Sequence, residues 1–153
     1  MGTDTRVSKI IYAPPERLYQ AFLDPALLAK WRVPDNMTAR VNSFEPREGG
    51  KYCITLTYRS GEESAYGKST PGTDTFRGVF VRLVPNEEII EKIEFESSDA
   101  KYIGEMTMTT TLTKVAGGCE VTVLCEDLPR GIRPEDNEEG CRMALKNLAR
   151  LVE

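Results

Sequence analysis

Hydrophobic residues alternate with polar ones through much of the chain, most regularly in residues 51–58 (KYCITLTY). Tyr52, Ile54 and Leu56 occupy every second position there, and Tyr58 continues the series. Because successive side chains of a strand point to opposite faces of a sheet, this period of two predicts a strand that is buried on one face only.

The end of the chain has a helical period instead. Residues 135–153 read EDNEEGCRMALKNLARLVE. In this segment Cys141, Leu145 and Leu148 recur at intervals of three and four, as along one face of an α-helix. Pro134 precedes it, where the first helical position needs no N–H group, and the acidic residues of the first turns suit the helix dipole. We therefore expect a long C-terminal helix that needs a broad apolar surface to cover it.

The remaining patterns predict a sheet with two further short helices. Strands are expected at residues 6–12, 38–44, 51–58, 76–84, 89–96, 103–115 and 119–126, and short helices at 16–23 and 25–31. The chain contains no repeat, low-complexity segment or linker, so residues 1–153 are expected to form one domain. Seven strands with one long helix, and a helix pair between the first two strands, indicate an α+β fold class.

A four-residue turn at residues 85–88 gives an expected register for the fourth and fifth strands. It sets Val84 opposite Ile89, Arg82 opposite Glu91, Phe80 opposite Ile93 and Gly78 opposite Phe95. This register gathers the aromatic side chains on one face, whereas a shift of one residue would mix apolar and charged side chains on both faces.

The last hairpin has its turn at Gly117-Gly118. We expect Ala116 to face Cys119, Leu112 to face Val123, and Thr110 to face Cys125. In that arrangement Met106 and Met108 lie on the inner face with Leu112, Val121 and Val123, while Thr107, Thr109 and Thr111 face solvent.

Composition and charge remove several function classes. The chain of 153 residues is 40% hydrophobic and carries a net charge of −4, so it has the core of an ordinary globular domain and no basic stripe that would bind nucleic acid. No apolar run is long enough to span a membrane, and the N-terminus lacks the apolar core of a signal peptide. We expect a cytoplasmic protein that is a monomer or a weak dimer.

The absence of histidine excludes Ser-His and Cys-His nucleophile pairs and imidazole-ligated metals. The four cysteines, Cys53, Cys119, Cys125 and Cys141, form no CxxC pair, and we interpret them as small buried residues. We therefore expect no metal, no cofactor and no catalytic residue.

Several motifs resemble those of a known family. The stretch APPERLYQAFLDPALLAKW carries Ala13-Pro14-Pro15-Glu16, Phe22, Asp24-Pro25 and Trp31, and it is followed by Arg47, Gly49-Gly50, the FRGVF run of residues 76–80, Pro85 and the ending GCRMALKNLARLVE. In this order they resemble the START-like (SRPBCC) superfamily, and within it the activator of heat-shock protein 90 ATPase homologue (AHSA1-like) family. The resemblance covers essentially the whole chain.

The resemblance implies a helix-grip fold, also known from the birch pollen allergen. In this fold a curved seven-stranded antiparallel sheet wraps around the C-terminal helix and leaves an apolar cavity. Family members bind lipids, hydrophobic metabolites or partner proteins, and a few are enzymes. Two positions depart from many relatives: Arg32 replaces an aromatic residue after the tryptophan, and Cys141 replaces a tryptophan of the last helix.

The inward-facing residues define a candidate ligand site. Its members are Trp31, Tyr52, Leu56, Tyr58, Phe80, Arg82, Glu91, Phe95, Met106, Met108, Cys141 and Leu145. Without the resemblance most of this set would be interpreted as plain core.

Three features of this site have two interpretations. Arg82 and Glu91 form either an orienting or acid–base pair inside the cavity or, as we favour, an ion pair at the sheet edge. Trp31 is a cavity gate or, as we favour, a core anchor. The polar segment 59–74 is either a cavity lid or a flexible hairpin tip.

Three function classes follow. We favour a binding protein for a small hydrophobic ligand, a lipid or an apolar metabolite. The second is a protein-binding domain associated with a chaperone and hence with the stress response. The third is an enzyme of the cyclase or hydrolase type, for which the sequence offers no nucleophile–base pair.

Overall fold

The structure is a computed structural model that describes residues 3–58, 73–97 and 99–153. Its strands are β1 (Thr3–Ile11), β2 (Met37–Phe44), β3 (Lys51–Tyr58), β4 (Thr73–Val84), β5 (Glu88–Phe95), β6 (Glu105–Val115) and β7 (Gly118–Leu128). Its helices are α1 (Pro15–Leu23), α2 (Pro25–Trp31) and α3 (Pro134–Val152), with a short 3-10 turn at Ala100–Tyr102. The predicted elements are all present, with ends that differ by a few residues.

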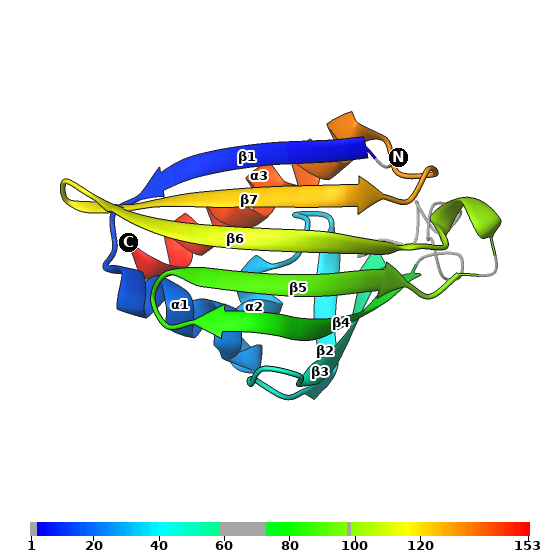
Figure 1. Ribbon diagram of the computed structural model, residues 1–153, viewed down its shortest axis with the longest axis horizontal. Coiled ribbons are helices and arrows are strands. Elements are labelled where there is room, and N and C mark those ends of the chain that lie inside the picture. The colour runs from blue at the N-terminus through cyan, green and yellow to red at the C-terminus, as the bar shows by residue number, and fades with distance from the viewer. Residues whose placement is uncertain (1–2, 59–72, 98) are drawn as a thin grey trace.

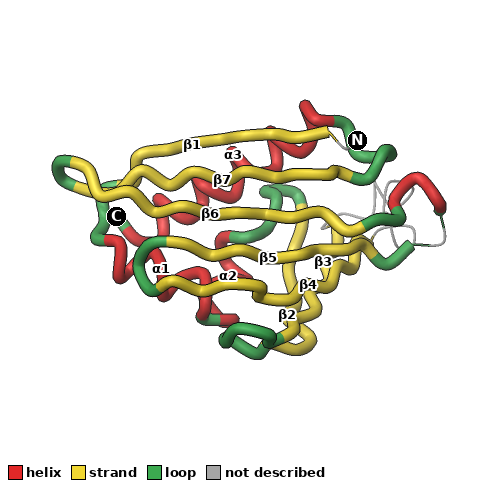
Figure 2. The backbone as a smooth tube through the Cα atoms, in the orientation of Figure 1, coloured by secondary structure: helices red, strands yellow, loops and turns green. Residues whose placement is uncertain are grey.

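The described strands form one antiparallel sheet in the order β1-β7-β6-β5-β4-β3-β2. Figure 1 shows β1, β7, β6 and β5 running side by side, while β2 and β3 cross them steeply because the sheet twists and curls. All three helices lie on the concave side of the sheet (Figure 2). The predicted helix-grip fold is therefore confirmed.

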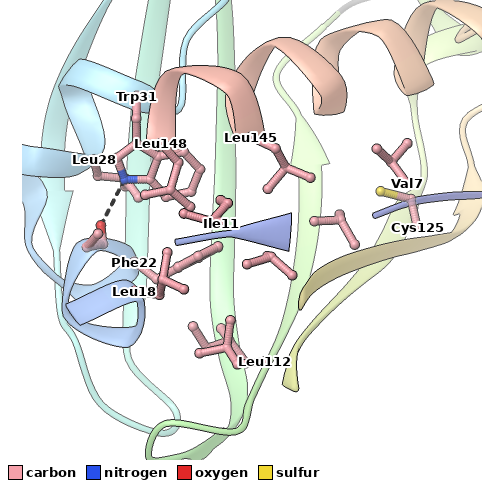
Figure 3. Close-up of a cluster of buried hydrophobic side chains, with 14 of the residues drawn as sticks. Val7, Ile11, Leu18, Phe22, Leu28, Trp31, Leu112, Cys125, Leu145 and Leu148 are labelled. Carbon is pink, nitrogen blue, oxygen red and sulfur yellow. Dashed lines mark hydrogen bonds between the residues drawn. The ribbon is translucent and has the colours of Figure 1, made fainter. Parts of the chain in front are cut away.

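The long helix covers only part of the concave face. It packs mainly against β1, while α1 contacts β6 and α2 contacts β2 and α3. Leu148 and Leu145, which are 0% and 2% exposed, point from α3 into the main apolar cluster with Ile11 and Leu18 (Figure 3). The middle of the sheet is left to be covered by large side chains.

The two short helices meet at a defined break. Asp24 ends α1 and accepts hydrogen bonds from the N–H groups of Ala26 and Leu27, which begin α2. At the other end of α2, the indole Nε1 of Trp31 donates a hydrogen bond of 2.9 Å to the carbonyl of Ala21 in α1 (Figure 3). This bond joins α1 to α2, and Trp31, which is 3% exposed, packs in the main apolar cluster.

The expected register of β4 and β5 is wrong, for two reasons. The turn contains three residues rather than four, so Val84 lies opposite Glu88. Asn86, with a φ of 66°, follows Pro85 in the pattern of a type II turn. The register shifts again between Phe80 and Arg82, where Val81 is an extra residue in β4.

This bulge reverses the direction of the side chains in β4. Before it, Phe80 faces inward opposite Glu91, and Gly78 lies opposite Ile93. After it, Arg82 lies opposite Ile90 on the outer face. There Arg82 forms an exposed ion pair with Glu88, of 3.1 Å, so the predicted pairing of Arg82 with Glu91 is also wrong.

The turn at Arg47–Gly50 supports the bulge. Gly49 donates its N–H to the carbonyl of Phe80, and Phe80 donates its N–H to the carbonyl of Gly50. Beyond the bulge, the N–H of Leu83 donates to the carboxylate of Glu48. The N–H and carbonyl of Phe80 and the N–H of Leu83 are therefore all bonded to this turn.

The register of β6 and β7 differs from the predicted one by two residues. Leu112 lies opposite Val121, Thr110 opposite Val123, and Met108 opposite Cys125. Because side chains alternate with a period of two, an even shift leaves every residue on its predicted face. Met106, Met108 and Thr110 face the concave side, and Thr107, Thr109 and Thr111 face away as predicted, though they are half-buried rather than fully exposed.

The packing of α3 predicts the effect of truncating Leu148. Leu148→Ala removes a fully buried side chain from the main cluster and should lower the free energy of unfolding by about 2–5 kcal/mol. Urea denaturation measures this change. Lys146→Ala, on the exposed face of the same helix, is the control and should change stability by less than about 0.5 kcal/mol. Equal, small effects at both positions would place α3 outside the core.

Candidate functional site

A cavity of about 490 Å³ lies between the concave face of the sheet, α2 and α3. Its wall is mostly apolar and comes from both layers, including Leu56, Tyr58, Phe76, Ile93, Phe95, Met106, Met108, Thr110 and Val123 of the sheet, and Phe22, Trp31, Cys141, Ala144 and Leu145 of the helices. The volume falls within the range of small-molecule pockets, roughly 300–1,000 Å³.

Several wall residues on the concave side are only partly buried. Leu56, Phe95 and Met108 of the sheet, with Cys141 and Ala144 of α3, are half-buried although they point inward. The apolar lining is therefore incompletely covered by protein, as a binding cavity requires.

The mouth of the cavity is formed by Asn36, Arg133 and Asp136, which are exposed residues of its wall. The segment 59–74, considered above as a lid, lies outside the described residues except for its last two. One of these, Asp74, is 3% exposed and lines the cavity.

Eight of the twelve predicted site residues line the cavity: Trp31, Leu56, Tyr58, Phe95, Met106, Met108, Cys141 and Leu145. Tyr52, Phe80 and Glu91 face the same side of the sheet but are fully buried and do not belong to the wall. Arg82 lies on the outer face and has no part in the site.

Tyr52 and Glu91 belong to a polar cluster with Arg32, a residue that the sequence did not place in the site. Arg32 Nη1 donates a hydrogen bond of 2.8 Å to Glu91 Oε1, and the Tyr52 hydroxyl donates one of 2.5 Å to the same oxygen. Arg32 Nη2 contacts the Tyr52 oxygen at 3.4 Å and the Met108 sulfur at 3.5 Å. We call Arg32, Tyr52 and Glu91 the polar cluster.

The polar cluster closes one end of the cavity. Along β5, Phe95 and Ile93 line the cavity, and Glu91 is the next inward-facing residue. Arg32 reaches this end from the C-terminus of α2 and is itself part of the wall, with 12% of its side chain exposed. The cavity therefore runs from an exposed mouth to a charged but internally paired end.

Aromatic rings hold the guanidinium in place. Its central carbon lies 5.6 Å from the centre of the Tyr52 ring and 5.8 Å from that of Phe76, within the range of cation–π attraction. Gly78 makes room for this packing, because a Cβ atom there would lie 2.1 Å from the Tyr52 ring. The FRGVF run thus supplies a gap for Tyr52 as well as two rings of the core.

Two groups of the polar cluster, Arg32 and Tyr52, hold their protons more tightly than usual. Burial disfavours the charged form of Arg32, but the charge of Glu91 and the hydrogen bonds to Glu91 and Tyr52 outweigh it, so the pKa of Arg32 is raised. Burial, chiefly, raises the pKa of Tyr52 well above its ordinary value of 10.0. Tyr52 therefore stays a neutral donor at every physiological pH.

A second polar contact links α3 to the sheet. Asn137 accepts hydrogen bonds from the hydroxyl of Thr5 and from the thiol of Cys141, and Cys141 is also hydrogen bonded to Cys125. The bond to Cys125 raises the pKa of Cys141 and lowers that of Cys125. Cys141 therefore presents an uncharged, small thiol to the cavity.

The sequence carries one signal for Arg32. Glu91 falls among the inward positions of its strand, where Ile89, Ile93 and Phe95 are apolar, and such a carboxylate needs a cationic partner. Arg32 directly follows Trp31, at the inward end of a short helix. The predicted register, which has no bulge, places Arg82 rather than Arg32 beside Glu91.

Comparison with known proteins places the chain in a family. The family described as Activator of Hsp90 ATPase homolog 1-like protein matches residues 12–153. Among solved structures, protein CV1439 from Chromobacterium violaceum has a TM-score of 0.86 and 34% identity, with 98% of this chain and 96% of that chain covered. The comparison with curated proteins gave no match.

Two more distant structures share the fold. The protein Mll3558 from Rhizobium loti is 24% identical, with a TM-score of 0.74 and 98% and 96% of the two chains covered. Protein Ms6760 from Mycobacterium smegmatis is 19% identical, with a TM-score of 0.75 and 98% and 90% covered. Among the described helices, none is long and apolar enough to cross a membrane.

The ion pair of the polar cluster predicts a strongly non-additive double mutant. Arg32→Met or Glu91→Leu alone leaves one buried charge without its partner and should cost about 3–5 kcal/mol of stability. Combining the two should recover most of that loss, because no buried charge remains. Chemical denaturation of the four proteins measures the coupling.

The exposed pair Arg77–Glu96, with a separation of 2.9 Å, is the matched control. Its coupling in Arg77→Met and Glu96→Leu should be at most about 1 kcal/mol. Additive losses at Arg32 and Glu91 would contradict the geometry described above.

The raised pKa of Tyr52 predicts a loss of stability at alkaline pH. Above pH 10 the unfolded chain releases this proton while the folded protein retains it, so the unfolded state binds fewer protons and stability falls as pH rises. The free energy of unfolding of Tyr52→Phe should therefore fall less steeply between pH 9 and 11 than that of the parent. Tyr12→Phe, at a 65% exposed position, is the control and should keep the parental slope.

Proposed function

We propose that this chain, which belongs to the family of Activator of Hsp90 ATPase homolog 1-like proteins within the START-like superfamily, binds one small apolar molecule in the cavity between its sheet and α3. The observation that carries the proposal is the incompletely covered apolar wall. Inward-facing side chains such as Phe95 and Met108 are left half-buried beside a volume of about 490 Å³. Exposed apolar surface of this kind is unfavourable unless a ligand covers it.

The chemistry of the wall supports an adaptable site. Met106 and Met108 are flexible and polarisable, and they lie beside the rings of Phe76 and Phe95. The two methionines accommodate different apolar shapes, while the fixed polar cluster limits how deep a ligand enters. A lipid-like chain or a compact apolar metabolite both satisfy these conditions.

A protein partner is the second candidate, because the family takes its description from an activator of a chaperone ATPase. A cyclase-type enzyme is the third. No catalytic residue, cofactor or metal is proposed. A single domain over residues 1–153, a cytoplasmic location and a monomeric or weakly dimeric state stay predictions from the sequence.

Filling the cavity should block binding. N-phenyl-1-naphthylamine, a neutral fluorophore whose emission rises in apolar surroundings, should bind the parent protein. Cys141→Trp, which places a large ring in the wall, should weaken this binding at least tenfold while the protein stays folded by circular dichroism. Lys146→Trp adds the same side chain on the exposed face of α3 and should leave binding unchanged.

Two outcomes would overturn the proposal. The parent protein could fail to bind the probe and show a filled core in a crystal structure. Alternatively, Cys141→Trp and Lys146→Trp could bind the probe equally well. The chaperone-associated role would then lead, and stimulation of heat-shock protein 90 ATPase activity by the purified chain would test it.

A further inference from the structure

Two polar atoms near the closed end of the cavity have no hydrogen-bond partner within the described part of the chain. They are Glu91 Oε2 and Thr110 Oγ1, and both residues are 0% exposed. A buried polar atom without a partner costs about 1–3 kcal/mol, so such atoms are rare and indicate an unrecorded partner.

The two residues lie close together on the concave face. Glu91 of β5 pairs with Met108 of β6, and Thr110 is the next inward-facing residue of β6. Diagonal neighbours of this kind have Cα atoms about 7–8 Å apart, which is within reach of one small group placed between the side chains. Thr110 and Met108 both line the cavity.

The charge at this end is already balanced. Glu91 carries one negative charge, and Arg32, which is held against its other oxygen at 2.8 Å, carries one positive charge. A ligand carboxylate would meet the Glu91 carboxylate, and a ligand ammonium would meet the Arg32 guanidinium. In a buried site either repulsion is strong, so a neutral polar group fits best.

The hydrogen-bonding properties of Glu91 and Thr110 narrow the choice of ligand group further. Glu91 Oε2, as part of an ionised carboxylate paired with arginine, only accepts hydrogen bonds. The Thr110 hydroxyl donates or accepts. A ligand hydroxyl can donate to Glu91 and at the same time accept from Thr110, whereas an ether or ketone can only accept.

Resting on the function proposed above, we propose that the ligand is an apolar molecule with an uncharged hydroxyl group at the end that enters first. Glu91 is not part of the wall in the ligand-free structure, so the proposal includes a shift of the flexible Met108 side chain, which pairs with Glu91 across the strands and lines the cavity. After this shift the hydroxyl donates to Glu91 Oε2 and accepts from Thr110, and the apolar body lies along Met106, Phe95 and Leu56 toward the mouth. The ligand class is therefore a hydrophobic alcohol rather than a fatty acid or an amine.

A matched set of compounds tests the class. 1-Octanol, octanoate, octylamine and octyl methyl ether should each be titrated against the parent protein carrying N-phenyl-1-naphthylamine, and emission from Trp31, the single tryptophan, provides a second readout. We expect 1-octanol to displace the probe at least tenfold more tightly than the other three. Equal binding of all four, or tighter binding of octanoate, overturns the inference while the probe binding still supports an apolar cavity.

Thr110→Val tests the assigned residue. Valine has nearly the same shape and lacks the hydroxyl, so 1-octanol should bind about tenfold more weakly while binding of the naphthylamine probe is unchanged. Removing a buried polar atom without a partner should leave the melting temperature equal or higher, which separates this effect from misfolding. Thr109→Val, on the outer face of the same strand, is the control and should change neither measurement.

Failure of this inference and failure of the proposed function give different experimental results. Absence of probe binding in the parent protein overturns the function proposed above and this inference with it. Probe binding with unchanged octanol affinity in Thr110→Val overturns only the assignment of the hydroxyl site.

Discussion

The structure depends on a mismatch in width between its two layers. Seven strands spaced about 4.8 Å apart make a sheet roughly 29 Å wide, while a single helix is about 10 Å across. A helix of 19 residues such as α3 is long enough, at about 28 Å, to run along the sheet but not to cover it. It packs mainly on β1, so the sheet has to curl and place α1 and α2 over the rest. The cavity is the space that the curled sheet and the three helices leave between β3–β6 and α3.

The polar cluster sets where this space ends. Its residues come from α2, β3 and β5, so its hydrogen bonds join three separate elements of the fold. A buried ion pair adds little to stability compared with a well-packed apolar alternative, but a misplaced partner is strongly unfavourable. The ion pair with Glu91 therefore ties the end of α2 to β5. The Trp31 bond to Ala21 extends the same constraint to α1.

The sequence was sufficient for the fold because its periodicities are long and regular. The alternation in residues 51–58 predicted β3 with its correct ends, and the even error in the register of β6 and β7 left Met106 and Met108 on the correct face. The site was predicted less well, because it depends on one extra residue. Val81 shifts β4 so that Arg82 turns outward. The one sign of this in residues 76–84 is that strict alternation would put the charged Arg82 inward between the apolar Val81 and Leu83.

Arg32 and Cys141, the two positions at which the resemblance led us to expect an aromatic residue, both belong to the cavity wall. Cys141 lies on α3 beside Asn137 and close to Cys125 of β7, and its small thiol leaves space in the wall. Arg32 lies at the closed end, where it replaces an aromatic ring by a cation that Glu91 neutralises. The first change widens the cavity, and the second makes its end polar without giving it a net charge. In the ligand complex proposed above, the groups that distinguish one ligand from another at the closed end are therefore Arg32, Glu91 and Thr110.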